Sequence, residues 1–222
     1  MSRCIVFDLD GTLADTSGDL IAAANACFAD MGAATRLDPT SDAGTALRGG
    51  RAMLTLGLKR EFGSVDETIV TRYYPFLLQA YSQAIDVHTV LYEGALEAVL
   101  RLRALGDKVA ICTNKPEGLA NILMMRLGVR DHFDALIGAD TLPTRKPDPA
   151  PLLAAIQLSG GQRERSVLVG DTITDRETAR AAAVPSVLVE FGPSGADMAA
   201  LEPDALLRHY NDLEDVLAKV CP

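Results

Sequence analysis

Two carboxylates lie two residues apart near the start of the chain, directly after a short apolar run. Asp8 and Asp10 follow Cys4–Phe7, and Gly11 and Thr12 come next. The run favours a buried strand that opens into a loop, with Thr12 shaping the turn through local hydrogen bonds. Strand periodicity places both carboxylates on one side of the backbone, where they repel each other unless a cation lies between them or one holds a proton. Such a pair suits nucleophilic attack by one carboxylate and proton transfer by the other, with a metal ion neutralising both; the alternative is a solvated acidic turn.

Three later segments carry residues of the types that bind phosphate or metal ions. They are Thr113 and Asn114 after one apolar run, Lys146 before a proline, and Asp171 and Asp175 after another apolar run. Each has an ordinary alternative: a strand end for the first pair, a solvated loop for the lysine and a helix N-cap for Asp175.

Taken in order, these segments resemble the four signature motifs of the haloacid dehalogenase superfamily, most of whose members are phosphotransferases. The resemblance covers nearly the whole chain and implies an α/β fold with a Rossmann-like parallel sheet core and an inserted, all-helical cap domain. The matching segments are Asp8-Leu9-Asp10-Gly11-Thr12, Val109-Ala110-Ile111-Cys112-Thr113-Asn114, Arg145-Lys146-Pro147-Asp148-Pro149 and Val167-Leu168-Val169-Gly170-Asp171-Thr172-Ile173-Thr174-Asp175.

The resemblance also implies a catalytic role for each matching residue. Asp8 would attack phosphorus to give an aspartyl-phosphate, while Asp10 would protonate the leaving oxygen and then activate the hydrolytic water. Thr113 and Asn114 would hold the phosphate oxygens that are not transferred. Lys146 would neutralise charge on the phosphoryl group and on the nucleophile.

The expected cofactor is Mg²⁺, held by oxygen ligands alone. Asp8, the backbone carbonyl of Asp10 and Asp171 would form this site, with room left for waters and phosphate. Asp175 lies one helical turn after Asp171 and is expected to contact the metal-bound waters or the essential lysine rather than the ion. The chain has only three histidines, none near these motifs, which argues against zinc.

Strand and helix signals alternate in the second half of the chain, which predicts a parallel sheet covered by helices on both faces. Ligands of such sheets bind at the carboxyl ends of the strands, where all four motifs lie. In the superfamily, the helix after the last motif often ends in Ala-Gly. Here the corresponding segment is Ala183-Val184-Pro185, and Pro185 is expected to end the helix. The expected strands are Val109–Thr113, Ala135–Gly138, Val167–Gly170 and Ser186–Val189; the expected helices are Ala95–Leu105, Glu117–Leu127, Ala150–Leu158 and Asp175–Ala183; and a short strand and closing helix are expected within Asp204–Val220.

The segment between the first motif and the second half has no β-rich run and is expected to be helical. Helices are predicted at Ser17–Met31, Ala52–Phe62 and Glu67–Ile85. Residues 15–87 would then form the cap, and residues 1–14 with 88–222 the catalytic core. The alternative is one continuous α/β domain with extra helices.

Two arginines in this segment are candidates for substrate specificity. Arg48 and Arg51 flank Gly49 and Gly50, which give a flexible break between helices. Their guanidinium groups are able to bind a substrate carboxylate bidentately if the loop closes over the site. The alternative is a pair of solvated arginines at a helix junction.

Composition narrows the possible partners. The 222 residues are 48% hydrophobic, enough for a core, and the formal net charge of −9 disfavours nucleic acid or an anionic membrane surface as a partner. Four scattered cysteines and the lack of an apolar stretch of about 18 residues indicate a reduced, cytoplasmic protein. Either a monomer or a homodimer is compatible with the sequence.

The expected function is hydrolysis of a small phosphorylated metabolite. The segments Leu91-Tyr92-Glu93-Gly94 and Thr113-Asn114-Lys115-Pro116 most resemble the phosphoglycolate phosphatases of the superfamily, which are phosphoric monoester hydrolases acting on 2-phosphoglycolate. A β-phosphoglucomutase-like phosphomutase, a pyrophosphatase and a nucleotidase remain as alternatives. A haloacid dehalogenase is disfavoured because it needs neither a metal nor Asp10.

Overall fold

The computed structural model describes residues 2–192 and 198–221. It divides into two compact units: a core unit, Met1–Ala14 with Leu91–Pro222, and an inserted unit, Asp15–Val90. The chain passes between the units at residues 14–15 and 90–91. These crossings lie in two short strands, β2 (Ala14–Asp15) and β3 (Val90–Leu91), which pair in a two-stranded sheet.

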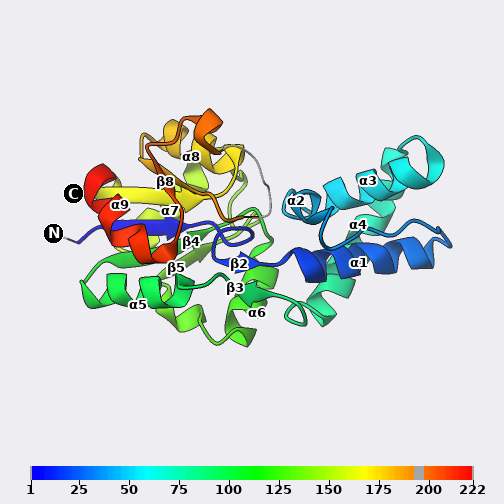
Figure 1. Cartoon of the computed structure of the whole chain (residues 1–222), viewed down its shortest axis with the longest axis horizontal. Coiled ribbons are helices and arrows are strands. Elements are labelled where there is room, and N and C mark those ends of the chain that lie inside the picture. Colours follow the sequence, from blue (N-terminus) through cyan, green and yellow to red (C-terminus); the bar gives the residue numbers. More distant parts are fainter. Residues whose placement is uncertain (1, 193–197, 222) are drawn as a thin grey trace. The chain divides into compact units, whose positions relative to one another are not determined.

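A six-stranded sheet forms the centre of the core unit (Figure 1). Its order is β5-β4-β1-β6-β7-β8, and every pairing is parallel. The strands are β1 (Cys4–Phe7), β4 (Lys108–Cys112), β5 (Ala135–Ile137), β6 (Ser166–Gly170), β7 (Ser186–Val189) and β8 (Ala205–Leu207). The four residues of β1 are fully buried, as expected of a central strand with packing on both faces. The predicted α/β fold with a parallel sheet is confirmed.

Helices complete the core unit. They are α5 (Ala95–Ala104), α6 (Glu117–Arg126), α7 (Ala150–Leu158), α8 (Ile173–Ala182) and α9 (Leu213–Val220), with short 3₁₀ turns at Arg130–His132, Arg163–Arg165, Met198–Leu201 and Tyr210–Asp212. Cys4 and Val6 of β1 share one apolar cluster with residues of α7 and α8. Because successive side chains of a strand point to opposite faces, Phe7 packs on the other face, against the ring of Tyr210. Every predicted element of the second half is present.

The end of α8 differs from the prediction. Ala182 is the last helical residue, and Ala183 adopts the left-handed conformation with φ 52° and ψ 46°. An alanine therefore makes the turn that glycine favours. The helix thus ends one residue before its predicted end at Ala183, and the role of Pro185 in stopping it stays a prediction.

The inserted unit is helical among its described residues. Its helices are α1 (Ser17–Asp30), α2 (Ala43–Ala46), α3 (Gly50–Phe62) and α4 (Glu67–Gln83). The three predicted helices of this segment correspond to α1, α3 and α4, whereas α2 was not predicted. Gly57 allows α1 and α3 to pack closely, because a Cβ there would lie 2.0 Å from Cζ of Phe28. Asp19 of α1 accepts hydrogen bonds from the backbone N–H groups of His88 and Thr89 at 2.9 Å, which ties the start of the unit to its end.

Within residues 2–192 and 198–221, no helix has the length and apolar character needed to cross a membrane.

Candidate active site

The loops after β1, β4 and β6 meet at the carboxyl edge of the sheet, because these three strands are neighbours. Phe7, the last residue of β1, lies opposite Ile111 of β4 and Val169 of β6. The N–H of Asp8 donates to the carbonyl of Val169 at 2.8 Å, so the strand pairing continues into the first motif. Gly11, with φ 82°, provides the turn that follows, in a conformation that L-residues rarely adopt.

Lys146 joins two carboxylates from different loops. Its Nζ lies 2.6 Å from Oδ1 of Asp175 and 3.1 Å from Oδ2 of Asp8. All three side chains are largely buried, and the lysine and Asp175 are each only 1% exposed. Burial opposes the lysine charge, but the two carboxylates outweigh it and raise the pKa of Lys146. The ammonium is therefore a fixed positive charge beside Asp8.

Asp175 contacts both Lys146 and the N-cap residue of α8. Its Oδ1 accepts from Lys146, while its Oδ2 accepts from the hydroxyl of Thr172 at 2.6 Å and from the Thr172 N–H at 3.1 Å. Thr172 is the N-cap of α8, so Asp175 completes a capping box rather than being the cap. Gly170 permits this packing, because a Cβ there would lie 2.4 Å from Cβ of Asp175.

Asp171 is the carboxylate with an unused oxygen. Its Oδ1 accepts a hydrogen bond from the hydroxyl of Thr12 at 2.9 Å. Its buried Oδ2 has no hydrogen-bond partner among the described residues, which is costly for a polar atom unless a ligand occupies that position. Thr12 therefore orients a carboxylate of a distant motif, in addition to the local turn predicted for it.

The buried carboxylates fit a divalent metal ion. One oxygen from each of Asp8, Asp171 and Asp175 lies within 4.8 Å of the others. Both oxygens of Asp175 and both oxygens of Asp8 already have partners, whereas Oδ2 of Asp171 has none among the described residues, so Asp171 offers the most available ligand atom. Among the described residues, the candidate ligand group consists of carboxylates alone, which suits a hard cation.

The electrostatics of the cluster lead to the same conclusion. Burial, with the neighbouring charges of Asp175 and Asp10, raises the pKa of Asp8 to about 7, although Lys146 opposes this shift. Burial and the charges of Asp175 and Asp8 likewise raise the pKa of Asp171. The cluster thus resists holding all its negative charges without a further cation.

A second buried lysine contacts the second carboxylate of the first motif. Nζ of Lys115 donates to Oδ1 of Asp10 at 2.6 Å, and the lysine side chain is only 4% exposed. Lys115 was not among the predicted site residues, although it belongs to the Thr-Asn-Lys-Pro segment that carries part of the resemblance. Two ammonium groups thus contact three of the four carboxylates, while Asp171 accepts from Thr12, and a divalent cation would neutralise the two remaining negative charges.

Thr113 and Asn114 support the neighbouring loops. The hydroxyl of Thr113 accepts from the N–H of Lys115 at 3.1 Å, and the side-chain amide of Asn114 donates to the carbonyl of Lys146 at 3.0 Å. The second motif therefore fixes the backbone of both buried lysines. Contact of Thr113 and Asn114 with phosphate stays a prediction.

Arg48 and Arg51 belong to the inserted unit, and their contacts there are local. Arg48 donates to the hydroxyl of Thr45 at 3.0 Å. Arg51 donates to the hydroxyl of Thr71 at 3.5 Å, and its guanidinium lies 5.0 Å from the ring centroid of Tyr74. Recognition of a substrate carboxylate by these arginines stays a prediction.

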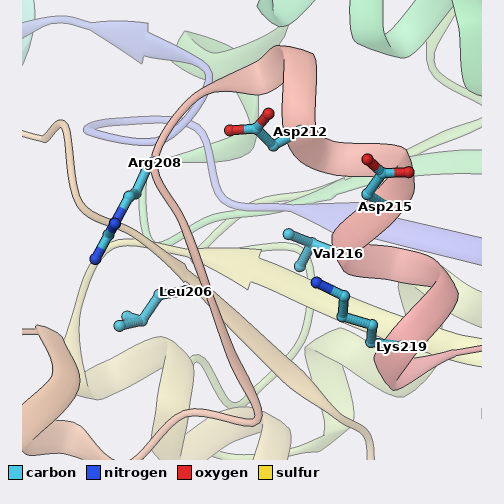
Figure 2. Close-up of a pocket in the computed structure, with 6 residues that line it drawn as sticks. All are labelled: Leu206, Arg208, Asp212, Asp215, Val216 and Lys219. Carbon is cyan, nitrogen blue, oxygen red and sulfur yellow. The ribbon is translucent and has the colours of Figure 1, made fainter.

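A separate surface depression of about 400 Å³ lies beside α9 in the core unit (Figure 2). It contains none of the motif residues, and its charged lining has two acidic and two basic side chains. The lining residues are Leu206, Arg208, Asp212, Asp215, Val216 and Lys219. This balanced lining has no chemistry comparable to that of the buried cluster.

Comparison with known proteins agrees with this site. Residues 5–189 match the haloacid dehalogenase-like hydrolase family. A phosphoglycolate phosphatase of Mesorhizobium japonicum is 39% identical over 99% of this chain and 96% of its own length, and one of Agrobacterium fabrum is 36% identical over 98% and 93%. A crystal structure of a predicted phosphoglycolate phosphatase from Haemophilus somnus has a TM-score of 0.85 at 22% identity, covering 97% of both chains.

The chain belongs to the haloacid dehalogenase-like hydrolases. It is similar over nearly its whole length to relatives that are phosphatases, that is, phosphoric monoester hydrolases. Phosphatases of this family generally use a divalent metal, for which the buried acidic cluster is the matching feature.

Proposed function

We propose that this protein is a Mg²⁺-dependent phosphatase that hydrolyses 2-phosphoglycolate through an aspartyl-phosphate intermediate. The observation that carries the proposal is the buried pair Asp8 and Asp171. One oxygen of Asp171 has no partner among the described residues, and this carboxylate lies close to the proposed nucleophile Asp8, which contacts Lys146. The names of the full-length relatives support the substrate.

Asp8 is the proposed nucleophile. Its carboxylate attacks phosphorus and forms a P–O bond, while the bond between phosphorus and the ester oxygen breaks. Lys146 neutralises negative charge on the nucleophile and on the phosphoryl oxygens as they approach each other. Mg²⁺ bound by Asp8, the carbonyl of Asp10 and Asp171 would supply additional charge neutralisation and orientation.

Asp10 is the proposed acid and base. It gives its proton to the leaving oxygen in the first step, so that glycolate departs as an alcohol. In the second step it takes a proton from water, which attacks phosphorus and releases Asp8 and inorganic phosphate. Thr113 and Asn114 would hold the phosphoryl oxygens through both steps.

The inserted unit is proposed to act as a cap domain that determines the substrate. The core residues recognise a phosphoryl group whatever it is attached to, so discrimination must come from groups that contact the leaving portion. Arg48 and Arg51 carry the charge and the planar donors that suit a small carboxylate. A small phosphorylated acid is therefore the proposed class of substrate.

Release of inorganic phosphate from 2-phosphoglycolate tests this function. The wild-type protein should release phosphate with Mg²⁺ and stop when EDTA removes the metal. Acid-quenched samples should contain a phosphorylated chain, and Asp8→Asn should abolish both signals because an amide is not a competent nucleophile. Asp171→Asn should retain some activity at high Mg²⁺ concentration, which separates loss of a ligand from loss of the nucleophile.

The phosphomutase alternative gives a different product. Efficient conversion of β-glucose 1-phosphate to glucose 6-phosphate, with little phosphate release from any small acid, would overturn the phosphatase proposal. Full activity after thorough chelation would overturn the metal, and unchanged turnover in Asp8→Asn would overturn the covalent step.

A further inference from the structure

The contact between Lys115 and Asp10 has no role in the proposed chemistry so far. The lysine lies in the loop between β4 and α6, and its Nζ is 2.6 Å from Oδ1 of Asp10. Its side chain is 4% exposed and that of Asp10 is 16% exposed, so the lysine is the more buried partner. A buried ammonium is expensive unless an opposite charge compensates it, which makes the pairing a strong constraint on both side chains.

The backbone of Lys115 is fixed on both sides. Its N–H donates to the hydroxyl of Thr113 at 3.1 Å, and its carbonyl accepts from the N–H of Ala139 at 2.9 Å. The ammonium therefore extends from a loop that is tied to β4 and to the segment after β5. A cation held in this way presents one orientation to the carboxylate without further ordering.

We propose that Lys115 is a positioning residue for the proton transfers of Asp10. By holding Oδ1, it would fix the carboxyl group so that the other oxygen faces the leaving-group oxygen in the first step and the water in the second. Lys115 stays an ammonium throughout, and the proton moves only between Asp10 and the reacting oxygens. The inference rests on the proposed function, because it needs Asp10 to be the acid and base.

This role predicts a dependence on the leaving group. The alkoxides released from ethyl phosphate and 2-phosphoglycolate are poor leaving groups that need a proton. The 2,4-dinitrophenolate released from 2,4-dinitrophenyl phosphate departs without one. Formation of the phosphoenzyme, which kcat/KM reports, should therefore suffer only for the two alkyl esters when Asp10 is badly placed. The second step is common to all substrates, so kcat falls for each of them.

The test compares Lys115→Met with wild type on these three substrates at saturating Mg²⁺. The expected loss in kcat/KM is about 10-fold or more for both alkyl esters and less than about 3-fold for the dinitrophenyl ester, since general acid catalysis contributes about 100-fold or more. Lys219→Met, at an exposed position of α9, is the matched control and should leave all three values unchanged. Lys115→Gln replaces Lys115→Met if the latter does not fold, as judged by circular dichroism.

A double-mutant cycle shows whether the lysine acts through Asp10. Adding Lys115→Met to Asp10→Asn should cause less than about 3-fold further loss, because the group that it positions is already gone. A fully additive loss in kcat/KM for the alkyl esters would overturn the inference. An equal loss in kcat/KM for all three substrates in Lys115→Met would do the same. Loss confined to 2-phosphoglycolate would also overturn it, because the lysine would then recognise the substrate carboxylate.

The same cycle separates this inference from the function on which it rests. Wild-type kcat/KM for ethyl phosphate in Asp10→Asn would remove the acid role and with it the proposed mechanism. A large loss in Asp10→Asn with an additive loss from Lys115→Met would leave the mechanism standing and remove only the role of Lys115.

Discussion

The hydroxyl of Thr12 donates a hydrogen bond to Oδ1 of Asp171 at 2.9 Å, across 159 residues of sequence. Both side chains are buried, and the other oxygen of Asp171 has no hydrogen-bond partner among the described residues. The threonine thus fixes which oxygen of the carboxylate remains available to a metal ion. Hydrogen bonds of this kind orient metal ligands in many proteins.

Thr12→Val should therefore weaken metal binding while leaving the chemistry largely intact. Valine has the same shape, so we expect the Mg²⁺ concentration for half-maximal phosphatase activity to rise about 10-fold or more, with turnover at saturating Mg²⁺ little changed. Titration of activity with Mg²⁺ measures this. Thr12→Ser keeps the hydroxyl and should behave like wild type, and an unchanged half-saturation value in Thr12→Val would contradict the prediction.

Stabilisation of the fold by Mg²⁺ should increase as the pH rises from about 5.5 to 8. Burial, with the charges of Asp175 and Asp10, raises the pKa of Asp8 to about 7 from an ordinary value of 3.8. In the metal-free protein, the folded state therefore binds more protons than the unfolded state between these values, and the contribution of this group to stability falls as the pH rises. Bound Mg²⁺ favours the ionised carboxylate, so Mg²⁺ stabilises the folded state most at pH values where Asp8 has lost its proton.

Thermal unfolding with and without Mg²⁺ at several pH values tests this coupling. The difference in melting temperature between the two conditions cancels the titration of distant groups. We expect this difference to grow with pH in the wild type and to flatten in Asp8→Asn. A Mg²⁺-induced shift that is equal at pH 5.5 and pH 8 would contradict the prediction.

Arg48→Ala and Arg51→Ala should each raise the KM for 2-phosphoglycolate by about 10-fold, the scale of a charge-assisted hydrogen bond. The KM for ethyl phosphate, which lacks the carboxylate, should change much less. Arg72→Ala is the matched control, because its guanidinium also lies over a tyrosine of α4, 5.8 Å from the ring centroid of Tyr73. Equal KM changes for both substrates would show that the arginines do not recognise the acid.

Ala183→Gly should stabilise the protein by about 1 kcal/mol, because an L-residue in the left-handed conformation is strained and glycine is not. Ala183 has φ 52° and an exposed side chain, so the substitution removes little packing. Ala181→Gly, at an exposed position inside α8, should instead destabilise it by about 0.5–1 kcal/mol. Urea unfolding measures the change in the free energy of unfolding for each variant. Destabilisation by Ala183→Gly would contradict the left-handed conformation of Ala183.

The elements of the core were predictable because their signals are local. Apolar runs such as Val167–Gly170 end in polar motifs, and glycines such as Gly106 and Gly128 mark the ends of helices. The four-residue helix α2, with the sequence Ala-Gly-Thr-Ala, is too short to show a helical period. The pairing of β2 with β3 depends on contacts between distant segments and has no local signal.

The candidate site was predictable residue by residue, but its contacts were not. Asp8 and Asp171 were identified by their motifs, whereas the bond from Thr12 to Asp171 depends on how the loops meet. Lys115 was missed because a lysine after Thr-Asn and before proline looks like a solvated loop residue. Only the fold shows that this loop lysine is buried against the carboxylate of Asp10.

The place of β1 in the sheet determines when this strand can pair during synthesis of the chain. This strand lies between β4 and β6, which begin at Lys108 and Ser166. During synthesis, β1 therefore lacks one partner strand until residue 108 is made and the other until residue 166. Pairing over such separations is slow and exposes apolar surface in the meantime. In a nascent chain, Cys4–Phe7 therefore stays exposed to aggregation until β4 and β6 have been translated.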